Sequence, residues 1–143
     1  MSRARPIGDA HVIIRSKVMI VSDHPVLLDG LHVIFGGTPD LEIVRTVQDV
    51  STLSGELACF QPDVVVVDLE LRNSGGLHAL RTLKSQVPWT PIIVLVNHLG
   101  EPTAIGSMDH TTHGQIARVS KSVTGEQLIV AVRAAATGRE PDH

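Results

Sequence analysis

The sequence predicts a doubly wound α/β domain built on a five-stranded parallel sheet. Short apolar segments alternate five times with segments of helical periodicity along the chain. Two of the apolar segments, in "DVVVVD" and "PIIVLV", are continuous and rich in β-branched residues, which is typical of strands covered on both faces. A length of 143 residues with 43% hydrophobic residues is sufficient for one domain with a real core.

The expected strands are the apolar segments themselves. They lie at residues 18–21, 41–47, 64–67, 92–96 and 116–119. The second and fifth are interrupted by charged residues, so the third and fourth define the centre of the sheet most clearly.

The first helix is expected directly after the first strand. Pro25 suits the first turn of a helix, and Val26, Leu27, Leu31 and Ile34 are spaced to fall on one face. Three further helices are expected at residues 50–60, 77–86 and 125–136.

The last two helical segments differ in their end signals. Thr124 and Gln127 have the spacing of a capping box, and Gly138 can end the helix that they begin. The segment at 101–114 is expected to form only a short or irregular helix, because proline, glycine and paired threonines lower its helix propensity.

Composition limits the class of protein further. The single cysteine, Cys59, cannot form an internal disulfide, so we expect a cytoplasmic protein with Cys59 in a helix core. Residues 1–16 contain only three consecutive apolar residues, which predicts a loose tail and no membrane span. A net charge of -3 and the absence of tyrosine give no indication of a nucleic-acid surface.

Three charged residues follow strands of the predicted sheet. In "QPDVVVVDLELRNSGGL" the apolar run ends on Asp68, while Asp23 follows the first strand and Lys121 follows the fifth. Parallel strands end at one edge of a sheet, where ligands bind in this class of fold. We therefore expect these residues to converge on a phosphoryl-acceptor site. The alternatives are that Asp68 caps a loop and that Lys121 is a solvated surface charge.

Four segments carry a resemblance to a known family: "KVMIVSDHPVLLDGL", "QPDVVVVDLEL", "GGLHALRTLK" and "VSKSVTGEQLIVAVRAAATG". They resemble the receiver domain of bacterial response regulators of the NarL/FixJ (LuxR-type) family, with Asp-His-Pro after the first strand. The resemblance covers residues 17–138, with 1–16 as a tail and 139–143 as a second tail or the start of a linker. It implies the flavodoxin-like receiver fold with strand order 2-1-3-4-5.

The resemblance also implies a function and partners. Such receivers are not enzymes in the ordinary sense: a histidine kinase phosphorylates the aspartate matched by Asp68, and Lys121 contacts the phosphate. Most members bind DNA through a helix-turn-helix domain, which this chain lacks, so we expect either a fragment or a single-domain receiver. A homodimer or a heterodimer with another regulator is expected.

The metal site departs from the family pattern. Receivers supply two acidic residues after the first strand to hold Mg²⁺, whereas this chain has Ser22 and Asp23. The remaining oxygen ligands implied for Mg²⁺ are Asp23, Asp68 and the backbone carbonyl of Glu70. With one carboxylate fewer, we expect Mg²⁺ to bind more weakly.

The signalling positions depart from the family as well. Val96 replaces the hydroxyl at the end of the fourth strand, and a lost hydrogen bond to a charged oxygen is worth about 1.5–3 kcal/mol. Arg118 aligns with the switching aromatic of the fifth strand, and the loop proline is replaced around Arg72. The stretch 97–115 has about three extra residues relative to the family.

Other polar residues receive simpler interpretations. Ser22 is expected to fill space rather than act as a nucleophile, because no base is arranged for it. His24 is expected in the turn that enters the first helix. The cluster of His98, His110 and His113 could hold Zn²⁺, but the segment resembles a loop without a second shell. Its simpler effect is a face whose charge rises below about pH 6.5.

Two functional hypotheses remain open. The favoured one is an atypical receiver with a degenerate phosphorylation pocket, in which pairing with another regulator or a ligand in the crevice sets the active state. The alternative is a conventional Mg²⁺-dependent receiver phosphorylated on Asp68 by a histidine kinase. A hydrolase on the same sheet would need a nucleophile and base pair that the sequence does not offer.

Overall fold

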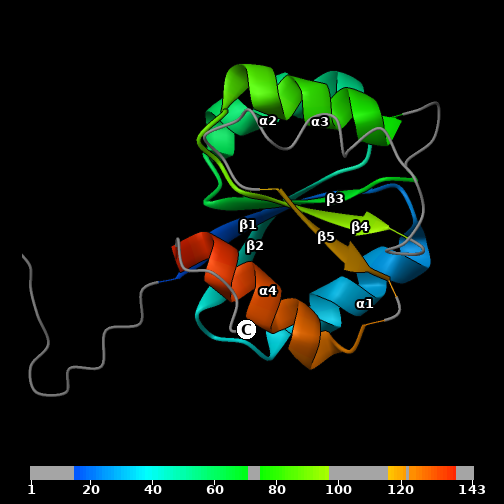
Figure 1. Cartoon of the computed structure of the whole chain (residues 1–143), viewed down its shortest axis with the longest axis vertical. Coiled ribbons are helices and arrows are strands. Elements are labelled where there is room, and N and C mark those ends of the chain that lie inside the picture. Colours follow the sequence, from blue (N-terminus) through cyan, green and yellow to red (C-terminus); the bar gives the residue numbers. More distant parts are fainter. Residues whose placement is uncertain (1–14, 71–74, 97–115, 122, 138–143) are drawn as a thin grey trace, which may run out of the picture.

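The computed structural model describes residues 15–70, 75–96, 116–121 and 123–137, and these form one sheet between two layers of helices (Figure 1). All strand pairs are parallel and the strand order is β2-β1-β3-β4-β5, which confirms the predicted fold class. The strands are β1 (Ser16–Val21), β2 (Leu41–Val47), β3 (Val64–Asp68), β4 (Ile92–Val96) and β5 (Ile116–Ser120).

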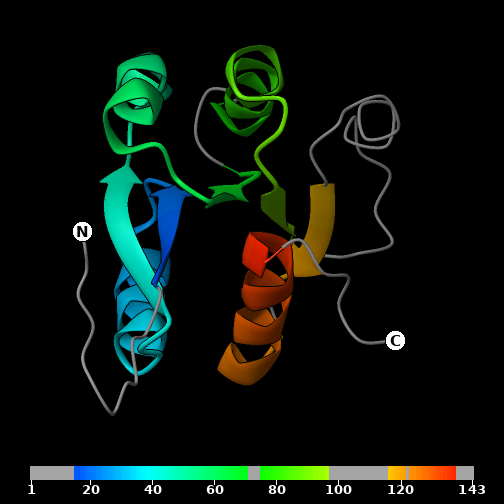
Figure 2. The same ribbon diagram turned by 90° about the vertical axis from the view of Figure 1, so that its left-hand side faces the viewer.

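Helices cover both faces of the sheet, as Figure 2 shows in the view along its edge. The elements are α1 (Pro25–Gly36), the short 3-10 helix η1 (Val50–Thr52), α2 (Leu53–Phe60), α3 (Gly75–Gln86) and α4 (Gly125–Thr137). Helices α2 and α3 cover one face, and α1 and α4 cover the other. The short helix expected within 101–114 lies outside the described residues. The helix expected at 125–136 is therefore labelled α4.

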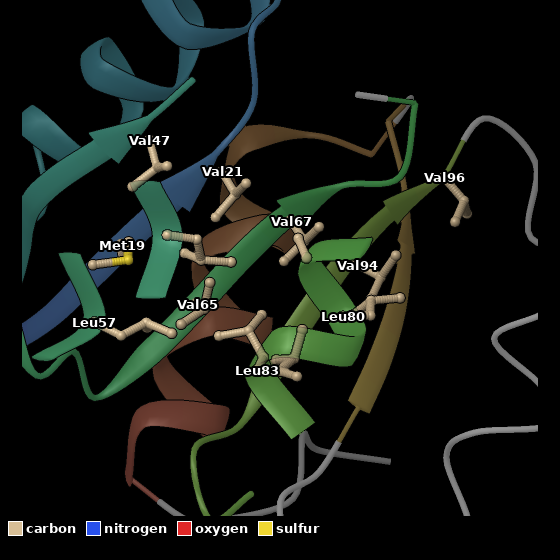
Figure 3. Close-up of a cluster of buried hydrophobic side chains, with 13 residues drawn as sticks. Met19, Val21, Val47, Leu57, Val65, Val67, Leu80, Leu83, Val94 and Val96 are labelled. Carbon is tan, nitrogen blue, oxygen red and sulfur yellow. The ribbon is translucent and has the colours of Figure 1, made fainter. Parts of the chain in front are cut away.

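The core consists of two apolar clusters, one on each face of the sheet. Met19 and Val21 of β1 point toward α2 and α3, whereas Val18 and Ile20 point toward α1 and α4. Figure 3 shows the first cluster, with Leu57 and Leu83 packed against the strands. Because successive side chains of a strand alternate between faces, both sets must be apolar in a sheet covered twice. This explains the continuous apolar runs.

Helix α1 begins as expected but buries a different face from the one predicted. His24 caps the helix, since its Nδ1 accepts a hydrogen bond of 3.3 Å from the backbone N–H of Leu27. The helix buries Leu28, Leu31 and Phe35, whereas Val26 is 75% exposed. The prediction was wrong in part, because α1 is apolar around most of its circumference and periodicity alone does not select the buried side.

Cys59 was predicted in a helix core and is exposed. The buried residues of α2 are Leu53 and Leu57, which lie one turn apart on the same side. Cys59 is two positions beyond Leu57, about 200° around the helix axis at 3.6 residues per turn. It therefore faces solvent.

The start of α4 confirms the predicted capping box. Thr124 Oγ1 accepts a hydrogen bond of 3.1 Å from the N–H of Gln127, and Gln127 Oε1 accepts one of 3.1 Å from the N–H of Thr124. This cap fixes the chain soon after Lys121. In the portion of the chain that the structure describes, no helix has the length and hydropathy needed to cross a bilayer.

Candidate functional site

Asp68 is the last residue of β3 and lies at the carboxyl edge of the sheet. Strand β3 pairs with β1 on one side and β4 on the other, so its end is held between two neighbours. The backbone N–H of Leu69 donates to the carbonyl of Leu95 at 3.1 Å, which extends this pairing beyond the aspartate. The Asp68 residue is only 2% exposed.

Three donors satisfy the Asp68 carboxylate. Oδ1 lies 2.9 Å from the Lys121 Nζ and accepts a hydrogen bond of 3.0 Å from the backbone N–H of Glu70. Oδ2 accepts a hydrogen bond of 3.0 Å from the Ser22 hydroxyl. A buried carboxylate needs such partners, because an unpaired charge in the interior is costly. The structure thus brings residues 22, 68 and 121 together from the ends of three strands.

Lys121 follows β5 and reaches back across the sheet edge. Its backbone N–H donates to the carbonyl of Val96 at 2.8 Å, and its ammonium also lies 3.2 Å from Glu70 Oε1. Burial alone would lower the pKa of this ammonium, but hydrogen bonds and charges from Asp68 and Glu70 outweigh that effect and raise the pKa. Lys121 is therefore a cation at neutral pH.

Ser22 has a more specific role than filling space. Its backbone N–H donates to the carbonyl of Val47 at 3.0 Å, and its side chain is fully buried. The hydroxyl accepts a hydrogen bond of 3.2 Å from the backbone N–H of His24 and donates to Asp68. No base for Ser22 was expected from the sequence, and therefore no nucleophile, but the hydrogen bond to Asp68 could not be predicted from the sequence.

The other predicted site residues occupy different surroundings. Asp23 is half-buried and follows Ser22 at the end of β1. Val96 is buried in the apolar cluster beneath α2 and α3 and provides no donor (Figure 3). Arg118 is exposed on β5. Four other positions considered in the sequence lie outside the described residues: Arg72, His98, His110 and His113.

Oxygen atoms dominate the metal ligands that this edge can supply. The carboxylates of Asp23 and Asp68 and the carbonyl of Glu70 are the kind of ligand that Mg²⁺ takes. Among the described residues, no three side chains of His, Cys, Asp or Glu are grouped to hold a metal ion. The site thus fits Mg²⁺ in the kind of ligand. The Asp68 carboxylate is already bonded by Ser22 and Lys121, and the Glu70 carboxylate is paired with Lys121.

Comparison with known proteins identifies the class. The profile of the response regulator receiver domain matches residues 18–133, so the chain belongs to this family. It is the receiver domain of a two-component response regulator, with the receiver fold described above.

Relatives of this receiver belong to proteins of more than one kind. The chain is 28% identical over 123 residues to the DNA-binding transcriptional activator DevR/DosR of Mycobacterium tuberculosis, covering 86% of this chain and 55% of that protein. It is 30% identical over 129 residues to a protein-glutamate methylesterase/protein-glutamine glutaminase of Pseudomonas syringae pathovar tomato, covering 84% and 36% respectively. The chain thus spans about half or less of these relatives.

A solved structure agrees with this assignment. The crystal structure of a LuxR-family two-component response regulator from an Aurantimonas species superposes with a TM-score of 0.76 at 26% identity, and covers 88% of each chain. NarL/LuxR-family regulators are therefore among the relatives of this receiver.

Proposed function

We propose that this chain is the receiver domain of an atypical NarL/FixJ (LuxR-type) response regulator whose phosphorylation pocket is degenerate. Its switching is weakened or independent of phosphate, and pairing with a second copy or another regulator sets the active state. One observation supports this most directly: Ser22, at the position where the family supplies a carboxylate, donates a hydrogen bond to Asp68.

Charge explains why this substitution weakens the pocket. Transfer of a phosphoryl group to a carboxylate brings negative charges together, so cations and donors must supply most of the stabilisation. Mg²⁺, when bound, supplies positive charge for this purpose. Here Asp23 and Asp68 are the acidic side chains at the metal-binding positions, while the partly exposed Glu70 carboxylate is paired with Lys121. With one acidic metal ligand fewer than the family pattern, the pocket is less negative by one charge and attracts a divalent cation less strongly.

The end of β4 supports a weakened switch independently. Val96 is buried among apolar side chains, and a methyl group cannot donate a hydrogen bond to a phosphoryl oxygen. Losing one such bond is worth about 1.5–3 kcal/mol, which reduces the preference of the phosphorylated protein for the active state by roughly one to two decades.

The proposed partners follow from the receiver class. A histidine kinase is the expected phosphodonor in the conventional alternative, and a second receiver is the expected partner in the favoured one. DNA binding would require a helix-turn-helix domain outside this sequence. We propose no enzymatic activity for the chain, because the segment shared with the methylesterase is only 36% of that enzyme.

Incubation with Mg²⁺ and acetyl phosphate tests the proposal. We expect intact-mass spectrometry to show little phosphorylated protein under conditions that fully phosphorylate a conventional receiver. The Asp68→Asn variant identifies the acceptor, because it removes the nucleophilic carboxylate while retaining a side chain of the same shape. A stoichiometric adduct in the natural protein that is absent from Asp68→Asn would establish the conventional alternative instead.

A second measurement examines transmission of the signal. Beryllofluoride, which mimics a phosphoryl group, should leave the oligomeric state measured by sedimentation unchanged, because Val96 cannot bond the mimic. A shift from monomer to dimer on adding beryllofluoride, abolished in Asp68→Asn, would contradict the proposal.

A further inference from the structure

The two carboxylate oxygens of Asp68 are not equivalent. Oδ1 is contacted by the Lys121 ammonium at 2.9 Å and by the backbone N–H of Glu70 at 3.0 Å. Oδ2 is contacted by the neutral Ser22 hydroxyl at 3.0 Å. An oxygen that already serves a cation and an amide is the poorer nucleophile, so Oδ2 is the better placed of the two to react.

The direction of the hydrogen bond between Ser22 and Asp68 is fixed by the surrounding groups. Ser22 Oγ accepts from the backbone N–H of His24 at 3.2 Å, and an ionised carboxylate can only accept. The hydroxyl proton must therefore point at Asp68 Oδ2. Because Ser22 is fully buried and its own N–H is bonded to the carbonyl of Val47, the residue has little room to turn away.

We propose that Ser22 is a positioning residue that restrains the acceptor: its hydroxyl donates to the Asp68 oxygen that would attack a phosphodonor and lowers the nucleophilicity of that oxygen. This inference rests on the proposed function, in which Asp68 is the acceptor of a weakened pocket, and goes beyond it. The residue at position 22 does more than omit a metal ligand. It adds a donor that stabilises the unreacted carboxylate.

The chemical step shows why such a donor slows phosphorylation. Asp68 Oδ2 attacks the phosphorus of acetyl phosphate, the bond from phosphorus to the bridging oxygen breaks, and acetate leaves with the electron pair. The product is an acyl phosphate on Asp68. The Ser22 hydrogen bond stabilises negative charge on Oδ2, and that charge falls as the bond to phosphorus forms, so the hydrogen bond favours the unreacted carboxylate over the transition state. A hydrogen bond to a charged group corresponds to roughly ten- to hundredfold in such an equilibrium.

The test separates the added donor from the missing metal ligand. The rate of phosphorylation by acetyl phosphate with Mg²⁺ is measured by intact mass for the natural protein, Ser22→Ala and Ser22→Asp, and Mg²⁺ affinity is measured separately by calorimetry. We expect Ser22→Ala to react about tenfold faster with unchanged Mg²⁺ affinity, since alanine removes the donor and adds no ligand. We expect Ser22→Asp to react faster and also to bind Mg²⁺ more tightly.

Two further variants serve as controls, one for the loss of a buried hydroxyl elsewhere and one for unfolding of Ser22→Ala. Thr90 is also a buried hydroxyl residue and precedes β4 at the opposite edge of the sheet, so Thr90→Val should leave the reaction rate unchanged. Ser22→Gly removes the same hydroxyl with less demand on space and serves as the second variant if Ser22→Ala is unfolded by circular dichroism.

The outcomes distinguish this inference from the proposed function. If Ser22→Ala and Ser22→Gly react at the rate of the natural protein or more slowly, the role of Ser22 is overturned. A faster reaction of Ser22→Ala or Ser22→Gly that is accompanied by tighter Mg²⁺ binding overturns it as well. Efficient phosphorylation of the natural protein overturns the degenerate pocket instead. The ratio of the rates then still decides whether Ser22 restrains Asp68.

Discussion

Two ion pairs of similar length occupy very different regions of this receiver. Asp68 and Lys121 meet at the carboxyl edge of the sheet at 2.9 Å, and Asp68 is 2% exposed. Arg133 of α4 binds Asp40 through both carboxylate oxygens, at 2.7 and 3.0 Å, with side chains 46% and 35% exposed. The first pair lies at the candidate site, and the second fastens α4 to the turn that precedes β2.

The comparison shows that burial, and not distance, distinguishes the ion pair at the candidate site from the pair on the outer surface. In water, solvent screens the attraction between charges, so even a well-formed surface pair contributes little. At the sheet edge the same attraction acts between a buried carboxylate, 2% exposed, and a largely covered ammonium, 21% exposed, and the carboxylate is also bonded by Ser22 and the amide of Glu70. Removing one partner there leaves a buried charge with fewer partners, and this is where mutation should have its largest effects.

The buried edge should also tolerate added atoms far less than the outer surface. A Cβ on Gly76, at the start of α3, would lie 2.7 Å from the Cα and the carbonyl carbon of Leu69, next to Asp68. We expect Gly76→Ala to lower the free energy of unfolding by about 3 kcal/mol, because the clash is with backbone that cannot move aside cheaply. Urea unfolding followed by circular dichroism measures the change.

Gly30 provides the matched control in the outer layer. It lies within α1, and nothing stands within 4 Å of a Cβ added there. Gly30→Ala should raise stability by about 0.5–1 kcal/mol, because alanine favours the helix and restricts the unfolded chain. Equal effects of the two substitutions would show that the edge around Leu69 is not tightly packed.

The buried ion pair should show the next largest effect. Lys121→Met is expected to cost about 2 kcal/mol, since Asp68 would keep only Ser22 and the amide of Glu70 as partners. The contribution of Lys121 should be complete below its ordinary pKa of 10.5 and disappear as the pH rises through its raised value in the folded protein.

Unfolding of the natural protein and Lys121→Met at a series of pH values examines this. The stability difference between them should be constant from neutral pH to about pH 10 and then shrink. A difference that is already absent at pH 7 would mean that the two side chains do not interact in solution.

The surface pair should give the smallest effect and the opposite pH dependence. Arg133→Gln is expected to cost at most about 1 kcal/mol. The hydrogen bonds and charge of Arg133 lower the pKa of Asp40 from its ordinary 3.8, so this contribution is present above that pH and is lost as the pH falls through the lowered value. The effect should also weaken in 1 M salt, whereas that of Lys121→Met should persist.

The stability losses of Arg133→Gln and Lys121→Met, each measured in low and in high salt, therefore test the role of burial. If Arg133→Gln proved as costly as Lys121→Met and as resistant to salt, exposure would not be what distinguishes the two regions.

The fold was predictable because its signals are local. Apolar β-branched runs bounded by turns located the strands to within two residues at their ends, and the capping box of Thr124 and Gln127 located the start of α4. The buried side of α1 was predicted only in part, since an almost wholly apolar helix has no single preferred face. The predicted burial of Cys59 was wrong because burial depends on which side of a two-turn helix meets the sheet.

The sequence by itself determined which residues end the strands, and therefore that Asp68 and Lys121 share one edge, because parallel topology carries all carboxyl ends to the same side. Only the tertiary structure decided which atoms meet there: that Lys121 and the amide of Glu70 share Oδ1, and that Ser22 donates to Oδ2. The physical reason is the range of the interactions. Apolar burial follows a periodicity written along the chain, whereas a hydrogen bond depends on tenths of an ångström between residues up to 53 positions apart, as at Asp68 and Lys121.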